Sequence, residues 1–297
     1  MPGTDTNRHY GADRFAPEFS SNGLVQRLVD LALDEDIGTG DVTTRTVIPE
    51  NARGRAVILA KEPLVVAGLD MARMVFKRVG PEVAFTAVAR DGDHVLDMVP
   101  LVELSGSLRQ LLIGERTALN FLQRMSGVAT HVRAYVEALG DSGVRLVDTR
   151  KTTPGWRLLE KYAVRVGGAG NHRMGLFDAV LIKDNHIAVC GGITEAVRRA
   201  RAGAPFMHRV EVECENMAQV AEAVEAGADV VMLDNMDNDA IAGAVREIAG
   251  RAMVEVSGRI TRERLAKLAG LGVDVVSSGA LTYAATAVDI SMDVYPG

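Results

Sequence analysis

The fold is decided by residues 209–258, RVEVECENMAQVAEAVEAGADVVMLDNMDNDAIAGAVREIAGRAMVEVSG. Short runs rich in Val alternate here with stretches whose apolar residues recur at helical spacing. The Val-rich runs predict strands near 209–214, 229–233 and 252–256, and the stretches between them predict helices at 216–226 and 238–249. Such alternation is typical of a parallel sheet whose strands are joined by helical crossovers.

The same alternation extends in both directions along the chain. Further strands are expected near 145–148, 179–183 and 273–277, and further helices at 156–166, 193–202 and 261–269. This pattern predicts an α/β fold, either a barrel or a doubly wound sheet. Nearly every expected strand ends in polar groups, whereas a doubly wound sheet concentrates them near its switch point. We therefore favour a TIM-like α/β barrel.

The first half of the chain has a different pattern. Its expected elements are a helix at 24–35, strands at 54–60, 83–89 and 99–105, a helix at 69–79 and a long helix at 108–139. This mixture predicts a small α+β domain joined by the long helix to the barrel. The expected divisions are a polar tail at 1–23, an N-terminal domain at 24–125, a catalytic barrel at 126–285 and a C-terminal segment at 286–297 that packs back on the N-terminal domain.

Composition excludes several classes of protein. The 297-residue chain has a net charge of −6 and 4% aromatic residues, whereas nucleic-acid binders usually carry a basic excess and stack bases on aromatic rings. The two cysteines have no zinc or redox spacing, which favours a reducing, cytoplasmic setting. No apolar run approaches the roughly 20 residues that span a bilayer, and no secretory signal is evident. We expect a cytoplasmic protein that binds neither nucleic acid nor membranes.

Cationic side chains gather at the ends of two expected strands and in one glycine-rich loop. They are Arg150, Lys151, His172, Arg173 and Lys183. Clustered cations need anionic partners, and Arg is suited to bidentate binding of carboxylate or phosphate. The alternative is a set of surface ion pairs with nearby acids, but Lys183 directly follows an apolar run and lies at the end of a buried strand. The cluster therefore favours an anionic ligand.

Acidic and small residues follow the remaining strands. Glu211 and Glu213 alternate with valines and point to one side of their strand, and Asp234 ends the next strand. Such carboxylates bind Mg²⁺ through substrate phosphates, stabilise a developing oxocarbenium ion, or form internal ion pairs with lysines at neighbouring strand ends. The turns Ser257-Gly258 and Ser278-Gly279 suit a phosphate group, but they also suit ordinary turns.

Eight motifs run in one order along nearly the whole chain beyond the tail. They are LDEDIGTGDVTT (33–44), GERTALNFLQRMSGVAT (114–130), DTRKTTPGWRLLEKYAVRVGG (148–168), NHRMGLFDAVLIKDNHI (171–187), VEVECEN (210–216), VMLDNM (231–236), VEVSGRIT (254–261) and SSGALT (277–282). Together they resemble the quinolinate phosphoribosyltransferase family, also called decarboxylating nicotinate-nucleotide pyrophosphorylases. The resemblance implies an N-terminal α/β sandwich followed by an incomplete, seven-stranded α/β barrel.

The resemblance also implies a reaction. Family members join quinolinate to phosphoribosyl pyrophosphate (PRPP) with Mg²⁺, and they release nicotinate mononucleotide, pyrophosphate and CO₂ in de novo NAD synthesis. It implies a homodimer whose active sites receive residues from the partner chain. Arg116 matches the arginine that the partner supplies. The expected catalytic residues are Lys151, Glu213 and Asp234, of which the two carboxylates lie near the Mg²⁺.

Other residues take binding roles from the same resemblance. Besides Arg116, the expected substrate-binding residues are Thr149, Arg150, His172, Arg173 and Lys183. The expected phosphate-binding residues are Ser257, Gly258, Ser278 and Gly279. One residue departs from the family pattern, because Arg259 replaces the second of two glycines that often follow the serine. A bulky residue there alters the loop or adds a phosphate contact.

Two other functions stay open on the sequence. Related phosphoribosyltransferases act on nicotinate without loss of CO₂ and hold a single carboxylate, whereas Arg150 together with Arg173 favours a dicarboxylate. A non-enzymatic relative would bind ligands in the same pocket. Such a protein is expected to lose some of the charged catalytic residues, and this chain keeps Lys151, Lys183, Glu213 and Asp234.

Overall fold

The computed structural model describes residues 19–297, so most of the polar tail expected at 1–23 lies outside the described residues. The chain divides into two compact units. The first comprises the chain up to Arg133 with Thr153–Gly168 and Ala285–Gly297, and the second comprises Ala134–Thr152 and Ala169–Ala284. No helix of the described residues is both long enough and apolar enough to cross a membrane.

An antiparallel sheet forms the centre of the first unit. Its strand order is β12 (Ile290–Pro296), β1 (Arg53–Ala60), β5 (Pro100–Ser107) and β3 (Ala84–Ala87). β12 pairs with β1 along its whole length, from Gly54 opposite Pro296 to Ala60 opposite Ile290. The C-terminal segment of the chain therefore completes this sheet. A two-stranded ribbon of β2 (Leu64–Val65) and β4 (His94–Val95) lies in the same unit.

The first unit also contains helices. They are the short 3-10 turn η2 (Phe19–Ser21) followed by α1 (Gly23–Ile37), α2 (Val42–Val47), α3 (Leu69–Val79), most of α4 (Leu108–Leu139) and α5 (Arg157–Val166). The sequence assigned α5 to the barrel, but its contacts place it in the first unit. The guanidinium of Arg124 on α4 lies 2.7 Å from the carboxylate of the buried Glu160, and the rings of Phe121 and Trp156 stack at 4.9 Å.

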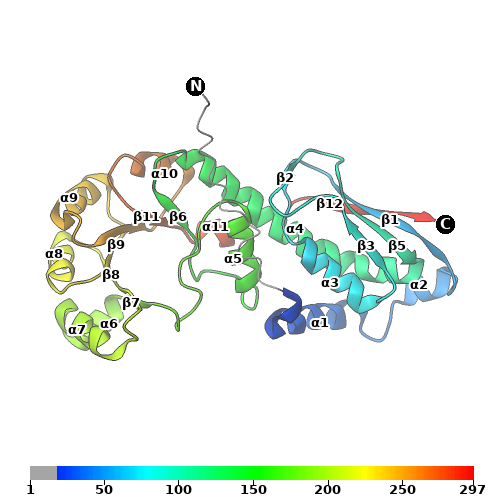
Figure 1. Cartoon of the computed structure of the whole chain (residues 1–297), viewed down its shortest axis with the longest axis horizontal. Coiled ribbons are helices and arrows are strands. Elements are labelled where there is room, and N and C mark those ends of the chain that lie inside the picture. Colours follow the sequence, from blue (N-terminus) through cyan, green and yellow to red (C-terminus); the bar gives the residue numbers. More distant parts are fainter. Residues whose placement is uncertain (1–18) are drawn as a thin grey trace, which may run out of the picture. The chain divides into compact units, whose positions relative to one another are not determined.

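The second unit contains the parallel sheet that the sequence predicts. Its strand order is β6 (Arg145–Val147), β11 (Val275–Ser277), β10 (Met253–Ser257), β9 (Val230–Asp234), β8 (Val210–Cys214) and β7 (Val180–Ile182). The helices are α6 (Asp184–Cys190), α7 (Ile193–Gly203), α8 (Met217–Glu225), α9 (Asn238–Ile248), α10 (Arg262–Leu268) and α11 (Ala280–Tyr283). Figure 1 shows α7 to α10 outside the curve of the strands. The predicted α/β class is confirmed.

The sheet curls around an interior. Residues from all six strands, or from the position just before a strand, line one cavity within the unit. The place of an expected seventh strand is taken by a single parallel bridge between Val147 and Gly170, outside the named strands. Among the described residues, the hydrogen-bonded order ends at β6 on one side and β7 on the other. The sheet is thus six strands wide, with one bridge beside β6.

Candidate active site

The carboxyl edge of the parallel sheet collects most of the residues that the sequence singles out. Asp234 ends β9 and pairs with Ser257 at the end of β10, so both lie at one level of the sheet. Other residues in the last two positions of a strand or just beyond a strand at this edge are Thr149, Arg150, Lys151, Lys183, Glu213, Gly258, Ser278 and Gly279. Arg116 is not among them, because it lies exposed on α4 in the first unit.

Lys183 and Glu213 form an ion pair at this edge. Lys183 follows β7, Glu213 lies in β8, and the ammonium group contacts the carboxylate directly. The Glu213 side chain is 14% exposed and that of Lys183 42%. An internal ion pair was one of the alternatives for these glutamates, and Glu213 adopts it. The pair is only partly buried, so an incoming anion or cation can still reach both groups.

A buried aspartate fixes the glycine-rich loop. Asp148 follows β6 and is fully buried, and its carboxylate accepts hydrogen bonds from the Asn171 side chain at 2.7 Å and from the His172 backbone N–H at 2.9 Å. The loop is therefore held beside the end of β6. The sequence places Asp148 at a strand end, but its motif alone does not reveal this supporting role.

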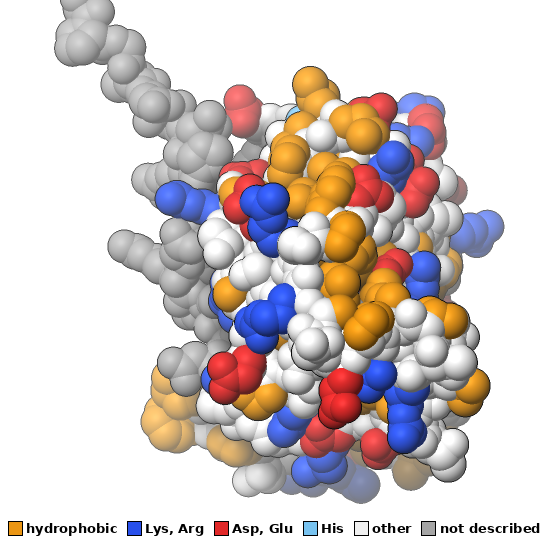
Figure 2. Space-filling model, turned by 90° about the vertical axis from the view of Figure 1, so that its right-hand side faces the viewer, with side chains coloured by type: hydrophobic (Ala, Val, Ile, Leu, Met, Phe, Trp, Pro, Cys, Tyr) orange, Lys and Arg blue, Asp and Glu red, His pale blue; other side chains and the backbone are white. Residues whose placement is uncertain are grey.

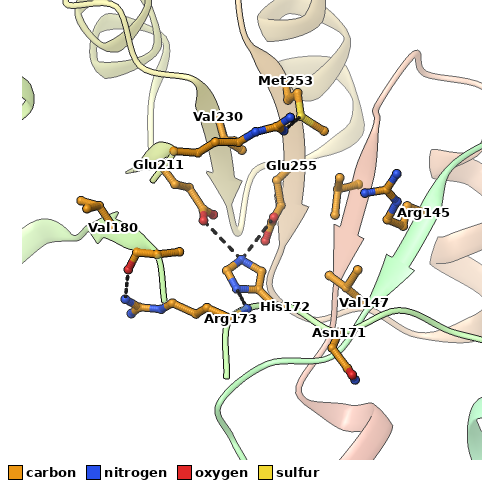
Figure 3. A pocket seen from close by; sticks show the side chains of 13 residues that line it. Arg145, Val147, Asn171, His172, Arg173, Val180, Glu211, Val230, Met253 and Glu255 are labelled. Carbon is orange, nitrogen blue, oxygen red and sulfur yellow. Dashed lines mark hydrogen bonds and ion pairs between the residues drawn. The ribbon is translucent and has the colours of Figure 1, made fainter. Parts of the chain in front are cut away.

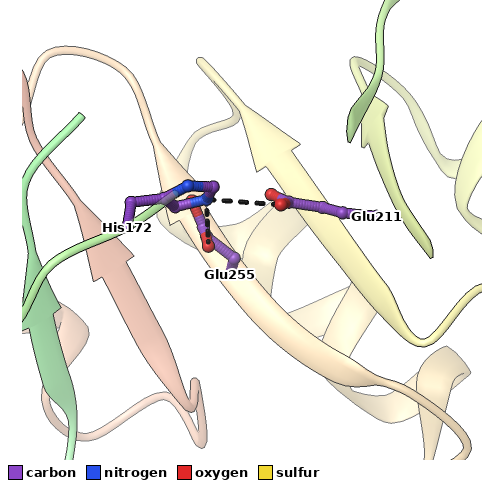
Figure 4. Close-up of side chains that lie close together, drawn as sticks. All are labelled: His172, Glu211 and Glu255. Atoms are coloured by element: carbon purple, nitrogen blue, oxygen red, sulfur yellow. Dashed lines mark ion pairs between the residues drawn. The ribbon is translucent and has the colours of Figure 1, made fainter. Parts of the chain in front are cut away.

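His172 points into the sheet interior, toward two buried glutamates. Its Nε2 lies 3.3 Å from Glu211 Oε2 and 3.5 Å from Glu255 Oε2 (Figure 4). These three side chains also have the composition of a metal site. However, Nδ1 accepts the backbone N–H of Arg173 at 2.8 Å, which leaves the ring proton on Nε2, between the carboxylates. The ring is then a hydrogen-bond donor to the glutamates.

The cluster of His172, Glu211 and Glu255 retains a proton through neutral pH. Burial lowers the pKa of His172, but hydrogen bonds and charges from the two glutamates outweigh burial and raise this pKa to about 10. Burial also raises the pKa of Glu211, and the charge of Glu255 adds to the effect. Because Nδ1 is already an acceptor, the extra proton belongs to the cluster as a whole.

Two arginines, Arg150 and Arg173, lie close enough for their charges to interact. Burial lowers the pKa of the Arg173 guanidinium, and the charge of neighbouring Arg150 lowers it further. Arg173 Nη1 donates to the carbonyl oxygen of Ala179 at 3.2 Å, a neutral acceptor. Like charges held this close favour an anion that contacts both.

The turn after β10 is shaped by residues in the left-handed region. Gly258 has φ +90°, and a Cβ there would collide with the Asn235 side chain. Asn235 and Arg259 take φ +56° and +49°, which costs a residue with a Cβ about 1 kcal/mol or more. Arg264 donates to the carbonyl oxygens of Gly258 and Met236 at 2.7 and 2.6 Å. The turn is therefore rigid, and its geometry suits glycine at two successive positions.

The turn after β11 lies against Lys151. A Cβ on Gly279 would lie 2.8 Å from Lys151 Cδ and 3.2 Å from Thr149 Oγ1. The Thr282 hydroxyl donates to the Lys151 carbonyl at 2.7 Å, and the Ser278 N–H donates to Val147 at 3.0 Å. Lys151 and the second expected phosphate turn are thus neighbours in the structure.

The chain is an α/β protein that gathers cationic and acidic side chains at the carboxyl edge of its parallel sheet. Two family models match the chain, "Quinolinate phosphoribosyl transferase, N-terminal domain" over residues 41–126 and "Quinolinate phosphoribosyl transferase, C-terminal domain" over 128–293. The chain belongs to the quinolinate phosphoribosyltransferase family.

Individual relatives agree with this assignment. The chain is 43% identical over 270 residues to a probable nicotinate-nucleotide pyrophosphorylase [carboxylating] of Bacillus subtilis, covering 91% of this chain and 93% of the relative. The crystal structure of NadC from Streptococcus pyogenes matches with a TM-score of 0.89 and 44% identity over 92% of this chain and 97% of that one. A nicotinate-nucleotide pyrophosphorylase structure from Ehrlichia chaffeensis matches with a TM-score of 0.88 and 36% identity. The match covers 95% of this chain and 100% of that one.

Proposed function

We propose that this protein transfers the phosphoribosyl group of PRPP to quinolinate, with release of pyrophosphate and CO₂ and formation of nicotinate mononucleotide for NAD synthesis. The observation that carries the proposal is the closeness of Arg150 and Arg173, whose like charges favour a dianion such as quinolinate. Relatives that match most of the chain are named for this reaction.

The cationic residues orient quinolinate in this proposal. Arg150, Arg173 and Lys183 bind its two carboxylates, and His172 and Thr149 line the same region. The ring nitrogen then attacks the anomeric carbon of PRPP, the N–C bond forms, and the bond to pyrophosphate breaks with its electron pair on the leaving oxygen. Positive charge on the sugar in the transition state is stabilised by Glu213 and Asp234.

Loss of CO₂ follows from the new bond. Alkylation makes the ring nitrogen positive, so the ring accepts the electron pair of the breaking bond to the 2-carboxylate. A proton from water then replaces the departed CO₂ at that carbon. The protein contributes position and electrostatics here, and no covalent nucleophile is needed.

The phosphate groups of PRPP are assigned to the turns at the carboxyl edge. Ser257, Gly258, Ser278 and Gly279 would hold the 5′-phosphate with backbone N–H groups and hydroxyls. Lys151 would lie between the two substrates, because it packs against Gly279 and follows Arg150.

Mg²⁺ fits the same edge as part of the PRPP complex. Asp234 and Glu213 offer carboxylate oxygens on adjacent strands, which are hard ligands of the kind that Mg²⁺ prefers. Two carboxylates do not make an all-protein cage, so the remaining ligands would be diphosphate oxygens and water. When bound, the ion neutralises the charge that develops on pyrophosphate.

A homodimer with shared active sites completes the proposal. The first unit exposes large hydrophobic side chains, and Figure 2 shows a band of hydrophobic side chains among charged ones on one face of this unit. Contiguous apolar surface of this kind is typical of protein interfaces. Arg116 on α4 is exposed in the single chain and is therefore available to a partner's site.

The test is an assay of the full-length protein with quinolinate, PRPP and Mg²⁺, in which nicotinate mononucleotide and CO₂ are measured together. The proposal expects both products in equal amounts and none after chelation of Mg²⁺. Nicotinate is the parallel substrate. Turnover of nicotinate without CO₂ would replace the proposal with a related transferase, and quinolinate binding without turnover would replace it with a binding protein.

A further inference from the structure

A cavity of about 240 Å³ opens at the amino end of the parallel sheet, opposite the edge that carries the proposed catalytic residues. The first residue of a strand lines it in five cases, and residue 209 precedes β8 directly. These six wall residues are Arg145, Val180, Arg209, Val230, Met253 and Val275. Figure 3 shows the labelled members of this wall around the interior.

The inner end of the cavity carries unsatisfied acceptors. Glu211 and Glu255 line it and are only 6% and 3% exposed. Their Oε2 atoms contact His172, but the Oε1 atom of each is buried without a hydrogen-bond partner. A buried carboxylate oxygen without a donor destabilises the protein, because it has lost its water partners and gained none. The inner end therefore suits a group with several N–H donors.

The outer end carries the opposite charge. Arg145 and Arg209 are exposed at the mouth, and among the described residues neither guanidinium forms an ion pair. Arg209 Nη1 instead lies 2.6 Å from the Met253 sulfur, a weak acceptor. Between the two ends, the walls are apolar, with Val180, Val230 and Val275.

We propose that this cavity is a second ligand site, which binds a small amphoteric molecule with an ammonium group on Glu211 and Glu255 and a carboxylate at Arg145 and Arg209. A simple cation is repelled by the arginines at the mouth. A simple anion binds there but leaves the inner oxygens unsatisfied. The volume is below the range of drug-sized pockets, so it suits a ligand of roughly ten non-hydrogen atoms.

His172 separates this cavity from the proposed catalytic edge. Its backbone is held by Asp148 after β6, and its ring reaches inward to the two glutamates. Arg173 also lines the cavity and belongs to the proposed quinolinate group. Quinolinate is therefore included in the test, so that binding at the two ends of the sheet is distinguished.

The experiment is calorimetric titration of the full-length protein with ω-amino acids from 3-aminopropanoate to 6-aminohexanoate. Two controls carry only one charged group each: pentanoate has the carboxylate, and pentylamine has the ammonium group. We expect the best amino acid to bind at least ten times more tightly than either control, a difference of about 1.4 kcal/mol. Equal binding of a control, or no heat from any amino acid at millimolar concentration, would overturn the proposal.

Variants locate the binding. Replacing both rim arginines (Arg145→Ser with Arg209→Ser) is expected to weaken binding of the amino acid at least tenfold. The same double variant should leave quinolinate turnover unchanged. Arg198→Ser on α7, an exposed arginine that does not line the cavity, is the matched control and should have no effect. Saturating quinolinate should change the affinity for the amino acid by less than twofold. Competition by quinolinate, or equal losses in the two arginine variants, would place the ligand elsewhere.

Discussion

Gly279 lies directly against Lys151, with room for a hydrogen atom but not for a methyl group. An added Cβ would lie 2.8 Å from Lys151 Cδ and 3.1 Å from Tyr283 Cε1. The turn that is expected to hold phosphate and the lysine that is expected to lie between the substrates therefore constrain each other. A change in one must displace the other.

Gly279→Ala is accordingly expected to lower kcat/KM for PRPP on the order of 10- to 100-fold, because displacement of a positioned group by about 1 Å is that costly. Steady-state kinetics at saturating quinolinate measures the change. Gly270→Ala is the matched control, since its Cβ would meet nothing within 4 Å. Unchanged kinetics in the Gly279 variant would remove Lys151 from the active site.

Arg259→Gly is expected to stabilise the protein and weaken PRPP binding. Arg259 has φ +49°, so glycine relieves strain of about 1 kcal/mol, while loss of the guanidinium removes a cation from the expected phosphate turn. Melting temperature and the KM for PRPP should both rise. Ala249→Gly has the same φ at the end of α9 and should raise only the melting temperature. An unchanged KM would mean that Arg259 contacts no phosphate.

The His172 cluster is expected to make the protein less stable as the pH rises. The pKa of His172 is about 10 in the folded protein against 6.5 as its ordinary value, so between these values the folded state holds a proton that the unfolded chain has released. The stabilisation is complete below about pH 6.5, declines as the pH rises, and is lost above about pH 10.

Thermal unfolding from pH 6 to 10 measures this effect. His172→Gln should be less stable than the wild type at pH 6, and the difference should narrow toward pH 10. His94→Gln, which replaces an exposed histidine on β4, should follow the wild type at every pH. A constant gap between the wild type and the His172 variant would show that the cluster of His172, Glu211 and Glu255 does not hold this proton.

Arg116 is expected to act in the partner's active site. Arg116→Ala and Lys151→Ala should each be nearly inactive, since each damages both sites of its own dimer. Mixed dimers contain one site with neither change, so random exchange of equal amounts should restore about a quarter of the wild-type activity. Assay before and after subunit exchange measures the recovery. No recovery after verified exchange would contradict a shared site.

The elements with strong periodicity could be predicted from the sequence. The helices at 69–79 and 108–139 begin and end as predicted, because each has a continuous apolar stripe. α6 was not predicted, since its seven residues include no buried side chain and therefore carry no periodic signal. β12 was expected only as a packing segment, because its pairing with β1 joins residues more than 200 positions apart.

The site residues also divide into those that the sequence pattern predicts and those that depend on contacts between distant segments. Residues at strand ends could be predicted, because parallel strands bring their carboxyl ends to one edge. The contacts of His172 with Glu211 and Glu255 could not, since three separate segments meet across the interior and no local pattern records the distance. Asp148 was seen as one polar residue of a strand end, whereas its role depends on the loop that it holds.

The pairing of β12 with β1 has a consequence for synthesis on the ribosome. β1 emerges early, but its partner is made only after every residue of the second unit has been translated. One long edge of β1 thus stays unpaired while the parallel sheet is produced, and an open edge can recruit strands of other nascent chains. Chaperone dependence during translation should therefore be governed by the antiparallel sheet, although three of its four strands are made before the second unit.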